Sequence, residues 1–145
     1  MAWSKLATML ALGAMFVALF ITPAKADYVD ITIDVSEQLM YVQTGYGQQE
    51  VYPVSTARKG YSTPYGEFSP YYLAKMHYSK KYDNAPMPHS IFFKGGYAIH
   101  ATYDIKRLGR PASHGCVRLH PEHAERLFYW VREVGMDHTA IRIVP

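Results

Sequence analysis

Apolar and polar residues alternate in the stretch YVDITIDV, residues 28–35, and this alternation constrains the fold more than any other feature. Val29, Ile31 and Ile33 fall on one side of an extended chain, because successive side chains of a strand point to opposite faces. LMYVQT follows after a Ser-Glu-Gln turn, and EVYPVST follows after a Gly-Tyr-Gly turn. Three alternating segments joined by tight turns predict antiparallel strands with one buried face.

The middle of the chain predicts further strands, and its C-terminal part predicts one helix. FSPYYLAKMHYS and SIFFKGGYAIH read as extended segments, after a turn at Pro64 and Gly66. PEHAERLFYWVREVG begins with Pro121 and closes at Gly135, the residue types favoured at those positions. Apolar residues at helical spacing form its buried side: Ala124, Leu127, Phe128, Val131 and Val134. With a last strand, TAIRIV, the pattern predicts a mainly β domain of mostly antiparallel strands with one packed α-helix.

Residues 1–26 have the pattern of a secretory signal peptide: a positive charge, an apolar run, and Ala24 and Ala26 before the expected cleavage point. An uncleaved anchor is the alternative, although the run is slightly shorter than the ~20 residues of a spanning helix. A lipoprotein is excluded, because Cys116 lies far from the cleavage point. We therefore expect export to the periplasm or cell envelope, with no stable membrane span, and one domain over residues 27–145.

The expected domain is nearly neutral. The sequence has 15 Lys and Arg and 12 Asp and Glu residues, and loss of Lys5 and Lys25 with the signal leaves 13 basic residues. This balance does not resemble the charge pattern of a nucleic-acid-binding protein. The length suits a single core, and no repeat or long linker divides it.

The sequence has one cysteine, Cys116, within SHGCVRL at residues 113–119. Small exported domains often carry disulfides, but a lone cysteine leaves three options: an intermolecular bridge, a reactive thiol or a buried apolar side chain. The turn-forming and polar neighbours favour a reactive thiol. An unperturbed thiol is only about 3% ionised at neutral pH, so a nucleophile needs a lowered pKa or a nearby base. His114 and His100 are the candidate bases.

Ile99-His100, a loop, and then SHGCVRL at 113–119 resemble the active-site signature of the L,D-transpeptidases, the YkuD-type catalytic domain. The segments SEQLMYV, YPVST, STPYGEF and MPHSIFFKGGYAIHAT also resemble that family, so the resemblance extends over residues 28–144. It implies a YkuD-like mixed β-sandwich or barrel with one packed helix, in an exported single-domain form.

The resemblance also implies roles for the motif residues. Cys116 matches the nucleophile, His100 matches the general base, and His114 matches a histidine that orients and supports the site. Gly115 allows a tight turn in which nearby N–H groups, including that of Cys116, face a developing oxyanion. Ser113 is expected to hydrogen-bond within this turn.

Arg118, Ala101 and His89 also bear on the expected site. Arg118 either holds a substrate carboxylate with its forked cation or makes an internal hydrogen bond that holds the loop. Ala101 stands where many relatives have glycine after the base histidine, but its carbonyl can still orient the imidazole. His89, in MPHS, stands where relatives commonly have an aromatic residue, and we expect it on the substrate side of the site.

The implied reaction is acyl transfer on peptidoglycan stem peptides. Cys116 attacks the carbonyl of the third residue, a diamino acid, and expels the terminal D-Ala. The acyl group then passes to the amine of another stem, giving a 3→3 cross-link in cell-wall biogenesis, or to the amine of an envelope protein. Water as the acceptor would make the enzyme an L,D-carboxypeptidase. The implied chemistry requires no metal or other cofactor, because a thiolate with a base suffices.

Two different hypotheses remain open on the sequence. Cys116, His114, His120 and His123 lie within ten residues, and His120-x-x-His123 has plausible spacing for metal ligands. The other hypothesis is a module that binds the cell wall without catalysis, for which an intact cysteine and histidine pair is unnecessary.

Overall fold

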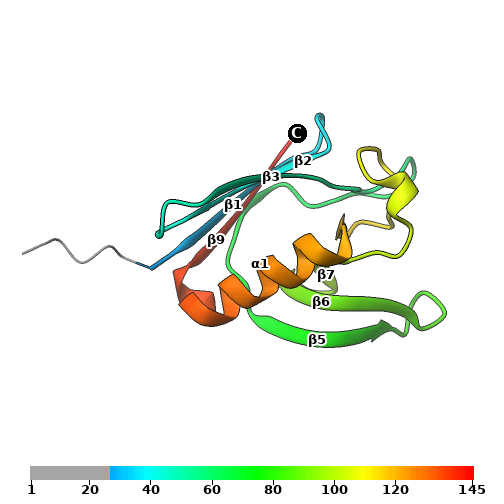
Figure 1. Cartoon of the computed structure of the whole chain (residues 1–145). Helices are drawn as coiled ribbons and strands as arrows, with labels where there is room; N and C mark the ends of the chain where they lie inside the picture. The colour runs from blue at the N-terminus through cyan, green and yellow to red at the C-terminus, as the bar shows by residue number, and fades with distance from the viewer. Residues whose placement is uncertain (1–26) are drawn as a thin grey trace, which may run out of the picture.

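The computed structural model describes residues 27–145, and the signal peptide predicted at 1–26 lies outside these described residues. The described part forms two β-sheets with one α-helix packed beside them (Figure 1). Sheet A has the strand order β3 (Gln49–Pro53), β2 (Leu39–Thr44), β1 (Val29–Asp34), β9 (Thr139–Val144) and β4 (Gly66–Phe68). Sheet B has the order β5 (Tyr72–Ser79), β6 (Ala85–Lys94), β7 (Tyr97–Ala101) and β8 (Val117–Leu119).

Sheet A follows from the alternation at the start of the domain. Val29, Ile31 and Ile33 of β1 are at most 1% exposed, while the residues between them face outwards or are half-buried. β1 pairs antiparallel with β2 and parallel with β9. β3 lies at the edge of the sheet, a position that tolerates its Pro53, because proline donates no hydrogen bond to a neighbouring strand.

Sheet B begins as two antiparallel hairpins, β5–β6 and β6–β7, and ends in a parallel pair, β7–β8. The connection between β7 and β8 contains the short 3-10 helix η1 (Ile105–Arg107). In the parallel register Ile99 lies beside Val117, and His100 lies beside Arg118. This pairing brings the end of β7 next to the SHGC segment, which is distant from it in the sequence.

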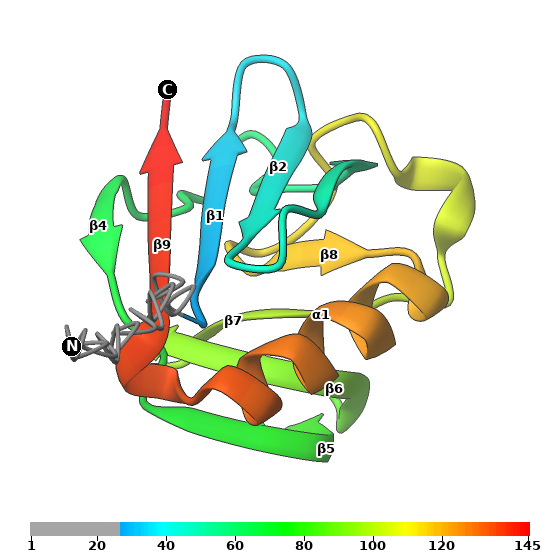
Figure 2. The ribbon, with the colours of Figure 1, turned by 60° about the vertical axis from the view of Figure 1, so that its left-hand side comes forward.

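Helix α1 (Pro121–Val134) confirms the predicted helix. It begins with Pro121 and ends at Val134, and its C-cap is Gly135, whose φ of 97° suits glycine. Its apolar side, with Ala124, Leu127, Phe128 and Val131, is buried. The helix packs against β6 and β7 (Figure 2) and leads through the 3-10 helix η2 (Met136–His138) into β9. No helix within residues 27–145 is long and apolar enough to cross a membrane.

The two faces of sheet B pack into different hydrophobic clusters. Ile91, Ile99 and Val117 belong to the main core, together with the inner side chains of sheet A and the apolar side of α1. A smaller cluster contains Ala74, Met87, Phe92 and Ala98, and Cys116 packs against it. Because side chains alternate along β6, β7 and β8, this cluster lies on the face turned away from the main core. Together with the crossing sheets visible in Figure 2, this arrangement confirms a mainly β sandwich.

Candidate active site

A pocket of about 900 Å³ opens beside Cys116. Five of the residues singled out in the sequence line it: His100, Ser113, His114, Cys116 and Arg118. Tyr82 and its neighbours in the β5–β6 hairpin form another part of its wall.

His100 occupies the fourth position of β7 and is 6% exposed. Its Nδ1 lies 2.8 Å from the carbonyl oxygen of Ala101. Because a carbonyl only accepts, Nδ1 carries the proton, and Nε2 is left as an acceptor. Burial lowers the pKa of His100 to about 4, and the charges of Arg118 and His77 act in the same direction. His100 is therefore neutral at physiological pH and has the protonation state of a base.

Cys116 lies one residue before β8 and is partly buried. Its thiol donates to the carbonyl oxygen of Gly96 at 3.7 Å. Burial raises the pKa of the thiol, while the Ala98 backbone and the charge of Arg118 oppose this shift. The pocket thus contains a neutral thiol and a neutral imidazole. Because the pKa of the thiol is not lowered, a nucleophile at Cys116 would depend on a nearby base.

The turn before Cys116 is held by side-chain hydrogen bonds. The Ser113 hydroxyl donates to the carbonyl of Cys116 at 2.6 Å and accepts from the N–H of Gly115 at 2.9 Å. Gly115 has a φ of 132°, and a Cβ there would lie 2.5 Å from the Tyr97 ring and 2.8 Å from the Ser62 carbonyl. Glycine is therefore required at this position both by backbone conformation and by space.

A buried polar network supports the same turn from the loop after β3. The Thr63 hydroxyl donates to the carbonyl of Gly115 at 2.8 Å and accepts from the N–H of Ala57 at 3.0 Å. The carbonyl of Thr56 accepts the N–H groups of Ala112 and Ser113. Sequence reasoning missed this support, because Thr63 and Gly115, like Thr56 and Ala112, are more than 50 residues apart and no local pattern marks them.

Gln38 extends the network to the β1–β2 turn. Its side-chain amide donates to the Thr56 hydroxyl at 2.6 Å and its carbonyl oxygen accepts the Thr56 N–H at 2.9 Å. Gln38 is 3% exposed and has a φ of 56°, so the backbone adopts an unfavourable conformation that directs this side chain inwards. Sheet A is thereby connected to the SHGC turn by buried hydrogen bonds.

His114 has a different environment, made of side chains. Its Nε2 lies 2.9 Å from Nη2 of Arg58, and since a guanidinium only donates, Nε2 is an acceptor. The ring of Tyr82 stacks on His114 at 4.2 Å, and Tyr61 meets it edge-on at 4.7 Å. Burial lowers the pKa of His114, and the cations Arg58, Arg118 and Lys81 lower it further.

Arg118 is a half-buried cation that lines the pocket. Its Nη1 lies 3.5 Å from the carbonyl of Ala112, at the limit of a hydrogen bond. No carboxylate oxygen of residues 27–145 comes within 4.0 Å of its guanidinium. Burial lowers the pKa of Arg118, as expected for a charge without a close counter-ion. Both alternatives from the sequence, a carboxylate ligand and an internal bond, are compatible with this geometry.

His89 does not line the pocket, which corrects its assignment to the substrate side. Its ring lies between β6 and α1, 5.3 Å from the ring of Phe128 and 6.0 Å from that of Tyr129. Its Nε2 is 3.9 Å from a carboxylate oxygen of Glu125. A φ of 51° at His89 turns the side chain towards the helix, and this backbone irregularity is not visible in the sequence.

The metal-site hypothesis is not supported by the geometry. His123 stacks on Tyr52 at 4.2 Å, and His120 caps α1 by accepting from the N–H of Glu122. Within residues 27–145, no three His, Cys, Asp or Glu side chains come together as a set of metal ligands.

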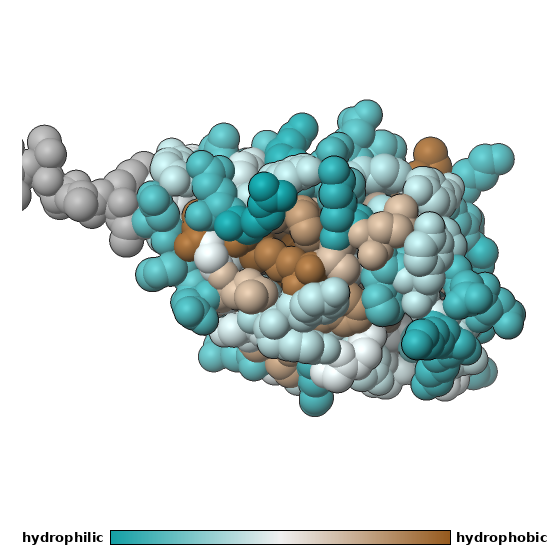
Figure 3. Space-filling model, turned by 90° about the horizontal axis from the view of Figure 1, so that it is seen from below, coloured by the Kyte–Doolittle hydropathy of each residue, from teal (hydrophilic) through white to brown (hydrophobic). Residues whose placement is uncertain are grey.

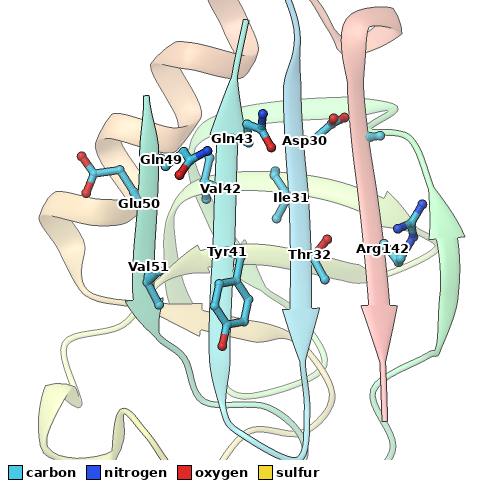
Figure 4. Close-up of a pocket in the computed structure, with 11 residues that line it drawn as sticks. Asp30, Ile31, Thr32, Tyr41, Val42, Gln43, Gln49, Glu50, Val51 and Arg142 are labelled. Atoms are coloured by element: carbon cyan, nitrogen blue, oxygen red, sulfur yellow. The ribbon is translucent and has the colours of Figure 1, made fainter. Parts of the chain in front are cut away.

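A second pocket, of about 480 Å³, lies on the outer face of sheet A. Figure 4 shows its side chains on β1, β2, β3 and β9, with Asp30, Thr32, Tyr41 and Gln43 among them. It contains neither a cysteine nor a histidine. The pocket beside Cys116 is therefore the candidate active site.

The fold is a β-sandwich domain, and its candidate site contains a cysteine and two histidines. The chain belongs to the L,D-transpeptidase family, since the model of the L,D-transpeptidase catalytic domain, YkuD, matches residues 28–142. This match confirms the family resemblance found in the sequence.

Solved L,D-transpeptidase structures share the fold. The protein from Stackebrandtia nassauensis is 25% identical with a TM-score of 0.69, and the match covers 86% of this chain and 58% of that one. The protein from Xylanimonas cellulosilytica is 27% identical with a TM-score of 0.62, covering 85% and 63%. L,D-transpeptidase 3 from Mycobacterium tuberculosis, solved with a faropenem-derived adduct, is 19% identical with a TM-score of 0.68, covering 82% and 61%. The chain thus spans about three-fifths of the length of these proteins. A comparison with proteins of curated function finds no match.

Proposed function

We propose that residues 27–145 are an exported peptidoglycan L,D-transpeptidase that uses Cys116 as its nucleophile and His100 as its general base. In this proposal residues 1–26 are removed as a signal peptide, and the domain acts in the periplasm or cell envelope. Its donor is a peptidoglycan stem peptide, and its acceptor is an amine of a second stem or of an envelope protein.

The observation that carries the proposal is the state of His100. Its Nδ1 donates to the Ala101 carbonyl, so Nε2 is an acceptor in the same pocket as the Cys116 thiol. Ala101 provides this carbonyl although many relatives have glycine there. The pKa of His100, about 4, keeps the imidazole unprotonated and ready to accept the thiol proton.

The first half-reaction forms a thioester. As Cys116 Sγ attacks the carbonyl of the third stem residue, Nε2 of His100 takes the thiol proton, and an oxyanion develops. The C–N bond to D-Ala then breaks, and the imidazolium returns the proton to the departing amine. Because the thiol is neutral at rest, proton transfer accompanies attack and does not precede it.

The second half-reaction restores the thiol. An acceptor amine attacks the thioester, His100 takes a proton from it, and Cys116 leaves and is protonated again. A diamino acid of another stem gives a 3→3 cross-link. Water in place of the amine would give an L,D-carboxypeptidase, which is the alternative function on the same donor.

The remaining motif residues stabilise the charges that develop. The N–H of Gly115 is already bonded to Ser113, so we assign the N–H of Cys116 to the oxyanion. Gly115 and Ser113 hold the turn that orients it, and His114 supports the site through Arg58. Arg118, a half-buried cation on the pocket wall, is assigned to a carboxylate of the donor.

Product analysis tests the proposal. Wild-type protein is incubated with disaccharide-tetrapeptides, and the products are identified by mass spectrometry. A 3→3 linked dimer with release of D-Ala is expected, whereas a tripeptide alone would favour the carboxypeptidase. Cys116→Ala should abolish both products and leave the circular dichroism spectrum unchanged. Turnover retained by Cys116→Ala would overturn the mechanism.

A carbapenem provides an independent test of the thiol. A strained β-lactam needs only the nucleophile, the base and the oxyanion donors, and a faropenem-derived adduct is present in the M. tuberculosis structure. We expect an adduct of one drug mass on the peptide with Cys116 and none on Cys116→Ala. Its formation rate should rise with pH as the Cys116–His100 pair reaches its reactive protonation state, because His100 must lose its proton, at a pKa of about 4, before it can act as a base. Absence of an adduct on folded wild-type protein would argue against an activated cysteine.

A further inference from the structure

Three aromatic side chains gather at the start of β5, on the face of sheet B where Cys116 lies. Tyr72 is the cross-strand partner of Phe92, and their ring centroids are 5.6 Å apart. The ring of Tyr71 lies 6.3 Å from the ring of Phe92. We refer to Tyr71, Tyr72 and Phe92 as the aromatic shelf.

The shelf presents tyrosine rings to solvent over an apolar base. Tyr71 is 54% exposed and Tyr72 is 53% exposed, whereas Phe92 beneath them is 6% exposed. The view from below, the side on which β5 lies in Figure 1, shows hydrophobic residues gathered near the middle of the surface and hydrophilic residues around them (Figure 3). Half-exposed tyrosines on a packed base are fixed in position and remain free to contact a ligand.

The shelf is continuous with the catalytic cysteine. Phe92 belongs to the cluster of Ala74, Met87 and Ala98, and Cys116 packs against that cluster. The 900 Å³ pocket is lined by Cys116 but by none of the three shelf residues. Cys116 therefore contacts two distinct surfaces: a polar pocket with Arg118, and an apolar surface that leads to the shelf.

The two surfaces differ in charge. The cations Arg58, Arg118 and Lys81 all act on His114 at the pocket side, and such a field suits the carboxylates of a stem peptide. The shelf consists of uncharged rings. A pyranose ring is uncharged and has an apolar C–H face with hydroxyls at its edge, so it can stack on tyrosine while its hydroxyls stay hydrated.

We propose that the shelf binds a sugar ring of the glycan to which the donor stem is attached, so that the enzyme prefers glycan-linked donors to free stem peptides. This inference rests on the proposed function. Three stem residues separate the sugar from the scissile bond, and an extended chain of that length spans at most about 10 Å. In the strand register Tyr72, Phe92 and Ala98 are neighbours on β5, β6 and β7, and Cys116 directly precedes β8, so Tyr72 lies three strand spacings, ~14 Å, from Cys116. A sugar attached beyond the end of the ~10 Å peptide therefore lies over Phe92 and Tyr72.

The test compares two donors that differ only in the sugar. For wild-type protein we expect kcat/KM to be about tenfold higher for a disaccharide-tetrapeptide than for the free tetrapeptide, a factor that corresponds to 1.4 kcal/mol. Tyr72→Ala should lose this preference and keep its rate on the free tetrapeptide, whereas Tyr72→Phe should retain the preference. Tyr46→Ala is the matched control, because Tyr46 is 51% exposed on the β2–β3 turn of sheet A.

Two outcomes would overturn the shelf proposal while leaving the proposed function intact. Equal kcat/KM for both donors in wild-type protein is the first. The second is a loss in Tyr72→Ala that is equal for both donors, because this would indicate a peptide contact.

If the protein processes neither donor, the proposed function fails. A direct binding experiment then tests the shelf proposal independently of activity. The Cys116→Ala protein is titrated with the peptide-free disaccharide and followed by NMR. We expect ring resonances of Tyr71 and Tyr72 to shift and those of Tyr46 to stay constant. No shift at Tyr71 and Tyr72 up to millimolar sugar would overturn the proposal.

Discussion

His100 and His114 line the same pocket, but they differ in burial and in the kind of partner that holds them. His100 is 6% exposed, and its Nδ1 is bound by the backbone carbonyl of the next residue. His114 is half-buried and is held by side chains, with Arg58 on its Nε2 and Tyr82 stacked on its ring.

The difference shows how one pocket can assign separate tasks to two identical side chains. A backbone partner cannot be removed by a side-chain substitution, so the tautomer of His100 is fixed by the strand itself. The Nε2 of His114 is occupied by a guanidinium donor, so that nitrogen is not free to take a proton. The histidine proposed as the base and the one proposed as its support therefore differ in geometry before any substrate binds.

The largest expected effect comes from removing the imidazole of His100. His100→Ala should lower the rate of carbapenem acylation by about a thousandfold, because general base catalysis contributes about 10² to 10⁴. His114→Ala should keep a measurable rate, since its ring is assigned to support. Intact-mass spectrometry over time gives both rates, with circular dichroism as the control for folding. The opposite ranking would reverse our assignment of the two roles.

The pH dependence of the free energy of unfolding should also distinguish His100 from His114. Above pH 6.5, folded and unfolded His100 are both neutral, and the contribution of burial is fully present. As the pH falls from 6.5 to about 4, the unfolded chain binds a proton that the folded protein excludes, so stability is lost. The expected loss from this residue is about 3 kcal/mol, by the conversion of 1.36 kcal/mol per pKa unit.

Urea unfolding at pH 7, 5.5 and 4 measures this loss. His100→Gln should show a shallower decline than wild-type protein over this range, and His114→Gln should show a smaller change in the same direction, because the pKa of His114 is lowered as well. Parallel declines for wild-type and His100→Gln would contradict the burial of a neutral His100.

A smaller effect is expected from Arg58→Met, which removes the hydrogen bond to His114 and keeps an apolar stem. The pKa of His114 should rise, because the charge of Arg58 contributes to lowering it. Acylation should slow by about tenfold to a hundredfold, which corresponds to the roughly 1.5–3 kcal/mol that a hydrogen bond to a charged group provides. An NMR titration of the His114 ring, compared with Lys81→Met, checks the shift. An unchanged or lower pKa of His114 in Arg58→Met would show that the charge of Arg58 does not lower the pKa of His114.

The smallest effect should follow Tyr82→Leu, which removes the ring stacked on His114. An aromatic pair contributes about 0.5–1.5 kcal/mol beyond area burial, so acylation should change by no more than about tenfold. Tyr82→Phe should match wild-type protein, because it retains the stack. A loss as large as that of His100→Ala would mean that His114 is the more important histidine.

Much of the fold was predictable because its signals are local. The alternation in β1, the proline and glycine at the ends of α1, and the apolar side of that helix each depend on neighbouring residues. The SHGC motif and His100 were recognised together, and the structure places both in one pocket. What is local in the chain could be predicted.

The features that could not be predicted depend on contacts between residues that are distant in the sequence. The support of Gly115 by Thr63, and of Thr56 by Gln38, joins segments that no pattern connects in the sequence. The orientation of His89 depends on a φ of 51°, which moves its ring from the expected pocket to the helix. The raised pKa of Cys116 follows from burial on a sheet that includes the parallel pair β7–β8, and this pairing was not predicted.

The position of β9 in sheet A has a consequence for how the domain folds. β9 inserts between β1 and β4, and Val29 pairs in parallel with Thr139. During synthesis β1, β2 and β3 can associate early, but one edge of β1 stays open until β9 emerges. An open strand edge can pair with other chains, and contacts of such long sequence separation form slowly. The nascent domain is therefore expected to be most prone to aggregation just before its C-terminal strand is released.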